Sequence, residues 1–164
     1  MRRLGCSGLE AAEGLCGLVL VAPSPPSPTV LSEEQRESLL HAYDSSESIA
    51  FVRDDVLTAL PLSDARKIQV IEDSLRGAPQ ARRARPTEIM LEDIRSDVAN
   101  INVPTLVLSG DHDQVDTTET LRREVLPRIA GARLEVLPGA GHLSMLESPE
   151  AIARAIASFI ATLP

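Results

Sequence analysis

The chain has 164 residues, a length that suits one domain with a small appended lobe. Its 43% hydrophobic content is enough for a buried core, which excludes a wholly disordered protein. Its net charge of −8 is repelled by nucleic acids and by anionic membrane surfaces, so neither is expected as a partner.

The first predicted element is a strand at residues 17–22. This stretch, Gly-Leu-Val-Leu-Val-Ala, is apolar throughout, whereas a strand with one solvated face alternates between apolar and polar residues. A continuous apolar run indicates a strand covered on both faces, as in a parallel sheet. The proline-rich residues 23–28 then end regular structure and lead the chain away.

Residues 32–100 contain helical patterns and no predicted strand. Ser32 and Ser63 are placed to cap two helices, because a serine side chain accepts hydrogen bonds from the free N–H groups of a first turn. Breaks are expected at Ala78-Pro79 and at Pro86, and a further helix is expected over residues 87–98. The segment is therefore predicted to be a helical lobe.

Residues 103–164 alternate between strand and helix patterns. Strands are expected at 105–109 and 133–137, and helices at about 117–126 and from Pro149 onward. The whole order is one strand, a helical lobe, and then strand, helix, strand and helix. That order predicts an α/β protein with three parallel strands and flanking helices.

Two titratable residues follow the last two predicted strands. Asp113 stands three residues past Gly110 in the loop that leaves one strand, and His142 follows the next strand through a turn with two glycines. In a parallel sheet, the carboxyl ends of both strands lie at the same edge. A carboxylate there can accept the Nδ1 hydrogen bond of a histidine, and a histidine can take and return a proton near neutral pH.

Neighbouring residues leave alternatives open. Asp111 is a second candidate for the acid. Glu147 is expected either to hold the loop after His142 through backbone hydrogen bonds or simply to be solvated. His41, within a predicted helix, and His112, beside the acid, are expected to be incidental.

The two cysteines, Cys6 and Cys16, have no cluster of Cys or His residues around them, so neither a metal site nor a disulfide framework is expected. Such cysteine usage is typical of the reducing cytoplasm, where we expect this protein. No apolar run approaches the roughly 18 residues of a membrane span, so no membrane partner is expected. The sequence has no glycine-rich loop for phosphates, and no cofactor is expected.

Residues 103–113 and 138–149 resemble the C-terminal portion of the α/β-hydrolase family, in which an acid and a histidine follow successive strands. The resemblance implies a partial α/β-hydrolase fold. In that fold, residues 13–31 and 101–164 belong to the core, residues 32–100 form a helical cap, and residues 1–12 stay unassigned.

The resemblance implies two members of a triad, with Asp113 as the acid and His142 as the base. The nucleophile of the family lies on a strand-to-helix turn that reads Gly-x-Ser-x-Gly. Gly5-Cys6-Ser7-Gly8-Leu9 comes close and makes Ser7 the candidate, but Leu9 replaces the final glycine. Only nine residues separate Ser7 from Gly17, whereas a crossover takes at least roughly 10–12 residues. We therefore expect Ser7 not to act as the nucleophile.

The resemblance implies a cofactor-independent hydrolase that acts on ester or related acyl bonds of a small-molecule substrate. The chain is expected to be a fragment that lacks the nucleophile and the oxyanion hole, and therefore to be inactive alone. One alternative is a non-catalytic remnant or interaction module whose exposed sheet edge pairs with another chain, and the same edge is expected to allow self-association. Another is one half of a two-chain hydrolase.

Overall fold

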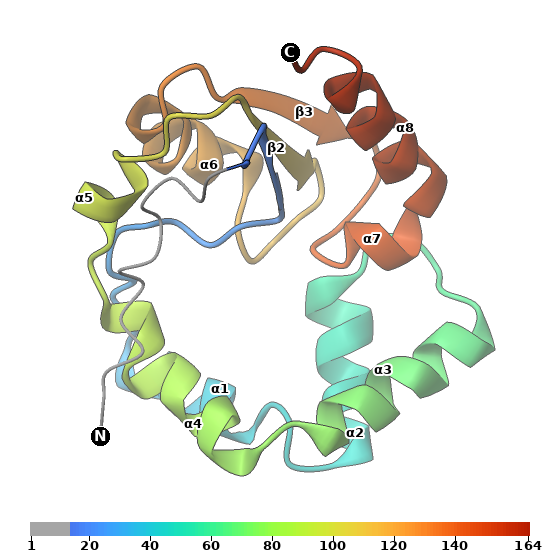
Figure 1. Cartoon of the computed structure of the whole chain (residues 1–164). Coiled ribbons are helices and arrows are strands. Elements are labelled where there is room, and N and C mark those ends of the chain that lie inside the picture. Colours follow the sequence, from blue (N-terminus) through green and yellow to red (C-terminus); the bar gives the residue numbers. More distant parts are fainter. Residues whose placement is uncertain (1–13) are drawn as a thin grey trace.

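The structure, a computed structural model, describes residues 14–164. Figure 1 shows the strands and their flanking helices, with a group of further helices to one side of them. The order of the elements is the predicted one, a strand, a helical lobe, and then alternating strands and helices. Ser7, the candidate nucleophile, lies outside the described residues.

Three parallel strands form the sheet, in the order β1, β2, β3. They are β1 (Leu18–Val21), β2 (Thr105–Gly110) and β3 (Arg133–Leu137). β2 lies in the middle, and all of its residues are buried. The outer edge of β1 pairs with no other strand of the described part of the chain. The predicted α/β fold with three parallel strands is confirmed.

The strands form two hydrophobic cores, one on each face of the sheet. On one face, Leu106 and Leu108 of β2 pack with Phe159 of α8 (Pro149–Ile160). On the other face, Val107 packs with Leu121 of α6 (Thr118–Glu124). Successive side chains of a strand point to opposite faces, so a continuous apolar run suits a strand that is covered twice.

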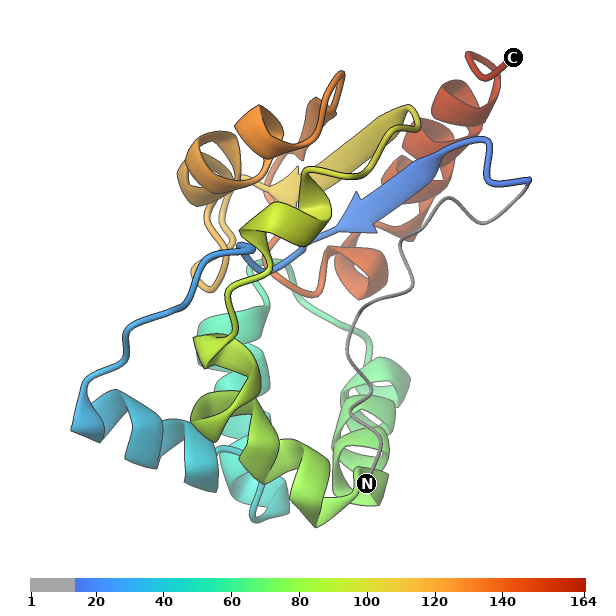
Figure 2. The ribbon, with the colours of Figure 1, turned by 60° about the vertical axis from the view of Figure 1, so that its left-hand side comes forward.

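The helical lobe lies between β1 and β2 in the sequence and to one side of the sheet in space (Figure 2). Its elements are α1 (Glu33–His41), α2 (Ser46–Val52), the π-helical turn η1 (Arg53–Leu57), α3 (Asp64–Arg76), α4 (Pro79–Thr87), the 3₁₀ turn η2 (Ile89–Leu91) and α5 (Arg95–Val98). Ser32 and Ser63 cap α1 and α3 as predicted.

Two short elements complete the chain, η3 (Leu126–Arg128) after α6 and α7 (Ser144–Glu147) before α8. Pro149 stands at the first position of α8, as predicted. Among the described helices, none combines the length and the apolar character that crossing a bilayer requires.

The predicted helix over residues 87–98 is wrong. Instead, α4 begins at Pro79 and contains Pro86 in its last turn, and two separate short elements follow it. Pro79 occupies the first turn of a helix, where its missing N–H breaks no hydrogen bond, so it begins a helix here. Glu92 has an extended backbone, which separates η2 from α5.

Leu121→Ala is expected to lower the free energy of unfolding by about 2–5 kcal/mol, because Leu121 is fully buried in the core beneath α6. The same substitution at Leu75, which is 44% exposed on α3, should cost less than about 1 kcal/mol. Urea unfolding followed by circular dichroism measures both. Equal losses at the two positions would contradict this description of the core.

Candidate active site

The loop that follows β2 lies directly against the turn that follows β3. A Cβ atom on Gly110 would come within 2.1 Å of the carbonyl oxygen of Ala140, so only glycine fits at the end of β2. The N–H of His112 donates to the oxygen of Ala140 at 3.0 Å, and the N–H of Asp111 donates to that of Leu137 at 3.3 Å. These backbone contacts hold the two loops together.

Asp113 and His142, the predicted acid and base, are joined by a hydrogen bond. His142 Nδ1 lies 2.9 Å from Asp113 Oδ2, and the Asp113 side chain is fully buried. The other oxygen, Asp113 Oδ1, accepts the N–H groups of Val115 at 2.8 Å and Asp116 at 3.0 Å. Both carboxylate oxygens are therefore fixed, and no side chain of the described residues hydrogen-bonds His142 Nε2.

The environment of Asp113 favours its ionised form. Burial by itself raises the pKa of Asp113, but the hydrogen bonds from His142 and from two backbone N–H groups outweigh it and bring the pKa below its ordinary value. An ionised carboxylate can only accept hydrogen bonds, so the network assigns the proton to Nδ1 of the neutral imidazole. The lone pair is then on Nε2, where a base needs it.

A further acidic side chain, that of Asp116, lies beside this pair. Asp116 is only 6% exposed, and its Oδ2 accepts a hydrogen bond from Ser24 Oγ at 3.2 Å. Burial is the main cause that raises the pKa of Asp116 above its ordinary value. Because Ser24 stands 92 residues earlier in the chain, the sequence carries no local signal for this contact.

The other candidate side chains are directed elsewhere. Asp111 Oδ1 accepts the N–H of Gly139 at 2.6 Å and lies 2.8 Å from His112 Nδ1. This carboxylate therefore binds the turn after β3 and makes no hydrogen bond with His142. His41 is exposed on α1, where it bonds two nearby acidic side chains. The structure brings neither Asp111 nor these two histidines to the pair.

Glu147 holds the loop that carries His142, which was one of its two predicted roles. Its Oε2 accepts the N–H of Gly141 at 2.9 Å. Its Oε1 accepts the N–H groups of Ala59 at 2.6 Å and Leu60 at 2.7 Å. This second link, to the helical lobe, was not predicted, because nothing in the sequence relates residues 59 and 60 to residue 147.

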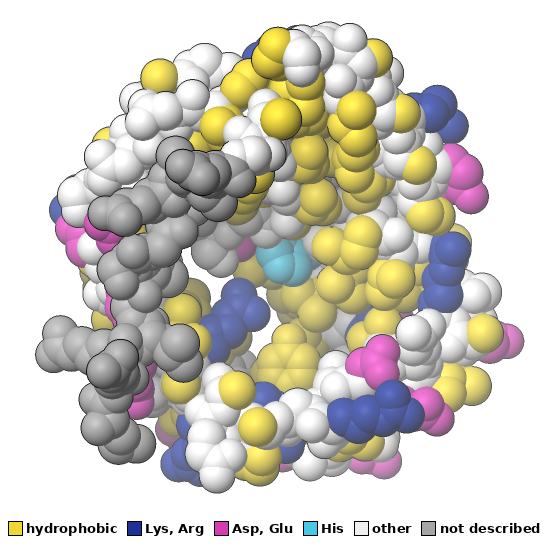
Figure 3. Space-filling view, in the orientation of Figure 1, with side chains coloured by type: hydrophobic (Ala, Val, Ile, Leu, Met, Phe, Trp, Pro, Cys, Tyr) yellow, Lys and Arg dark blue, Asp and Glu magenta, His cyan; other side chains and the backbone are white. Residues whose placement is uncertain are grey.

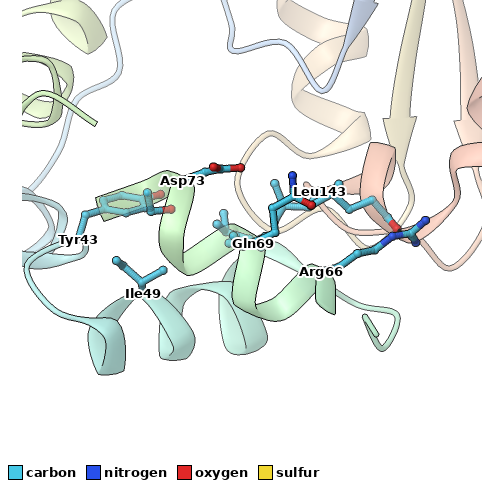
Figure 4. Close-up of a pocket in the computed structure, with 10 residues that line it drawn as sticks. Tyr43, Ile49, Arg66, Gln69, Asp73 and Leu143 are labelled. Atoms are coloured by element: carbon cyan, nitrogen blue, oxygen red, sulfur yellow. Dashed lines mark hydrogen bonds between the residues drawn. The ribbon is translucent and has the colours of Figure 1, made fainter. Parts of the chain in front are cut away.

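A pocket of about 260 Å³ lies between the helical lobe and the segment that follows His142 (Figure 4). Ile49 and Leu57 line it from the lobe, and Leu143 and Leu146 line it from the other side. Figure 3 shows the molecule hollowed between the sheet region and the lobe, with many hydrophobic side chains around the hollow. The pocket therefore contacts Leu143, the residue that directly follows His142 in the chain.

Sequence comparison relates the chain to known proteins. The model of a family described as "Alpha/beta hydrolase family" matches residues 4–155. A curated relative from Synechocystis sp., named "Putative non-heme chloroperoxidase", is 28% identical over 155 residues, which cover 86% of this chain and 55% of the relative. The chain thus spans about half the length of that curated relative.

Solved structures share the fold. An esterase, EaEST from Exiguobacterium antarcticum, has a TM-score of 0.79 at 21% identity, covering 94% of this chain and 60% of the esterase. A bromoperoxidase from Bacillus anthracis has a TM-score of 0.77 at 16% identity, covering 88% of this chain and 58% of the bromoperoxidase. At such low identity, the likeness shows that the fold is shared, and it does not show that the substrate is shared.

The opposite pKa shifts of Asp113 and Asp116 predict opposite effects of pH on stability. The lowered pKa of Asp113 means that its stabilising contribution is present above the unfolded pKa of about 3.9 and is lost as the pH falls through the native value. The raised pKa of Asp116 means that its contribution is present below the unfolded pKa and is lost as the pH rises through the native value.

We therefore expect Asp113→Asn to destabilise the chain most near neutral pH, and Asp116→Asn to destabilise it least there. Urea unfolding of both variants and of the wild type, from acidic to neutral pH, measures the two differences. Parallel pH dependences of the two variants would contradict the opposite shifts.

Glu147→Ala is expected to lower the free energy of unfolding by roughly 2–4 kcal/mol, because three backbone N–H groups lose a charged acceptor. Glu135→Ala is the matched control, since Glu135 is exposed on β3. Chemical unfolding of the two variants compares them. A loss no larger than that of the control would mean that these bonds do not hold the loop.

Proposed function

The chain belongs to the alpha/beta hydrolase family, and from that premise we propose that Asp113 and His142 are the acid and the base of a hydrolase that acts on ester or related acyl bonds. The observation that supports this most is the 2.9 Å contact between His142 Nδ1 and the buried carboxylate of Asp113. It leaves Nε2 as the proton acceptor. Such a pair has the geometry needed to activate a hydroxyl nucleophile.

The proposed reaction has two stages. A hydroxyl nucleophile attacks the acyl carbon, and its proton passes to His142 Nε2 while Asp113 stabilises the imidazolium. The tetrahedral intermediate collapses, the bond to the leaving alcohol breaks, and His142 returns the proton to the alkoxide oxygen. Water then attacks the acyl-enzyme in the same way, with the proton again passing through His142, and the carboxylic acid product leaves.

We propose that the nucleophile and the oxyanion-hole donors come from outside residues 14–164. Within the described residues no side chain hydrogen-bonds His142 Nε2. Ser7 is the candidate closest to the family pattern, but its motif ends in Leu9 where the pattern has glycine. On this proposal the chain supplies the acid and base half of the site, and it is inactive until the other half joins it.

The apolar pocket supports a small-molecule acyl substrate with a hydrophobic portion. Its lining residue Leu143 directly follows the base His142 in the chain, and we propose that the hydrophobic portion of the substrate binds there. One of the structural neighbours, EaEST, is an esterase, which agrees with this substrate class.

We propose that the protein is cytoplasmic, because the described Cys16 is an exposed free thiol, which suits a reducing compartment.

A second candidate function is that of a module completed by another chain, as in a two-chain hydrolase. The specific observation in its favour is the outer edge of β1, which pairs with no other described strand. An unpaired edge presents N–H and C=O groups that a strand of a partner, or of a second copy, can bind. Size-exclusion chromatography with light scattering separates this case from a monomer.

In a protein in which the N-terminal part of a related esterase completes this chain, His142→Ala should lower kcat on p-nitrophenyl acetate by roughly 10³–10⁶-fold. Asp113→Asn should cost a comparable or smaller factor, because the histidine then takes the wrong tautomer. The double variant should be little worse than His142→Ala, since the two side chains act as one unit. Steady-state kinetics measure all three.

Asp111→Asn is the control, because its carboxylate binds Gly139 and His112 and not His142. If Asp111→Asn proved as damaging as Asp113→Asn, the acid would have to be reassigned. The chain alone should show almost no turnover. Saturable turnover that both Ser7→Ala and His142→Ala abolish would place the nucleophile at Ser7 and overturn this proposal for the N-terminal residues.

A further inference from the structure

Asp116 joins the ends of two neighbouring strands beside the acid–base pair. Its N–H donates to Asp113 Oδ1 at 3.0 Å, and its carboxyl Oδ2 accepts from Ser24 Oγ at 3.2 Å. Ser24 follows β1, whereas Asp116 lies in the loop between β2 and α6. The side chain of Asp116 is therefore held where the strands end, and its backbone is bonded to Asp113, the residue that orients His142.

One hydroxyl group does not satisfy a buried carboxylate. Asp116 is only 6% exposed, and Ser24 is the one side chain of the described residues that hydrogen-bonds its carboxyl group. A buried ionised carboxylate is costly unless a positive charge or several donors compensate for the lost hydration. The negative charge of Asp116 thus depends on whether a cation stands nearby.

Three charged groups act on Asp116 from the elements around it: His142 from the loop after β3, Asp113 from its own loop, and Arg85 from α4 of the lobe. Burial is the largest influence and raises the pKa of Asp116, and the charge of Asp113 acts in the same direction. Positive charge on His142 and on Arg85, together with the Ser24 hydroxyl, lowers it. Of these groups, His142 is the one that changes its charge during the proposed reaction.

We propose that Asp116 is a positioning residue that supplies a second negative charge to the protonated form of His142, behind its direct partner Asp113. The proposal rests on the proposed function of His142 as the base. When His142 takes the proton of the nucleophile, the charge of Asp116 then adds to the direct hydrogen bond with Asp113 in stabilising the imidazolium. Ser24 contributes through Asp116, because its hydroxyl donates to the oxygen that carries the charge.

The coupling between the two side chains is reciprocal. If protonated His142 stabilises the ionised form of Asp116, then ionised Asp116 stabilises protonated His142 by the same free energy. The consequence is measurable without any substrate. Replacing Asp116 with a neutral side chain of the same shape should make His142 release its proton at a lower pH.

The test is an NMR titration of the His142 imidazole in the full chain, with its signals assigned against His142→Gln. In Asp116→Asn the midpoint of the titration should fall by roughly half a pH unit or more. Asparagine keeps the shape of the side chain and can still accept from Ser24, so a purely structural role would leave the midpoint unchanged. Glu119→Gln is the control, because Glu119 is exposed in the first turn of α6.

Ser24→Ala is the second variant, and it tests the proposed role of Asp116 if Asp116→Asn does not fold. Loss of the hydroxyl donor makes Asp116 harder to ionise, so the His142 midpoint should fall in the same direction by a smaller amount. A midpoint that is unchanged in Asp116→Asn, or in Ser24→Ala where that variant has to decide, overturns the proposal. An equal fall in Glu119→Gln would also overturn it, because the effect would then be general.

The titration does not depend on turnover, so the two proposals can fail separately. A shifted midpoint in the chain, combined with no ester hydrolysis by the completed protein, would refute the proposed function and leave the coupling intact. Ester hydrolysis with an unchanged midpoint would refute the role of Asp116 alone.

Discussion

The close approach of two backbones, at Gly110 and Ala140, is the constraint on which the acid–base pair depends. A Cβ atom at residue 110 would lie 2.1 Å from the carbonyl oxygen of Ala140, so any other residue would push the loop after β2 away from the turn after β3. Asp113 and His142 stand 29 residues apart and meet only because these loops touch. The pair is therefore a product of main-chain packing at the edge of the sheet, and the 2.9 Å hydrogen bond follows from that packing.

Carboxylates that accept backbone N–H groups fix the loops around this pair. Asp111 binds Gly139, Asp113 binds two N–H groups of its own loop, and Glu147 binds three N–H groups from two separate segments. Such bonds are charge-assisted, so they are stronger than those between neutral groups. Asp116 is the exception, because a single hydroxyl donates to its carboxyl group, and burial raises its pKa above the ordinary value.

The sequence predicted the parts of this structure that depend on local pattern. A continuous apolar run marked β1, and serines marked the starts of α1 and α3. Two titratable side chains that follow predicted strands marked the candidate acid and base. It failed at α4, where Pro79 was predicted to interrupt regular structure although a first-turn proline begins a helix. The contacts of Asp116 with Ser24, and of Glu147 with residues 59 and 60, join residues 92 and about 88 positions apart. Periodicity and spacing describe neighbours along the chain, so contacts of this kind become visible only in the folded structure.

The helical lobe and the loop of His142 are joined by direct backbone contacts. The N–H of Leu143 donates to the carbonyl oxygen of Leu57 at 2.9 Å, and Glu147 binds the two residues that follow Thr58. A Cβ atom on Gly141 would lie 2.9 Å from the nitrogen of Ala59, so the two segments touch with no side chain between them. Leu57 and Leu143, which make this contact, also line the apolar pocket. The same backbone contacts thus shape the pocket and anchor the loop that carries His142 to the lobe.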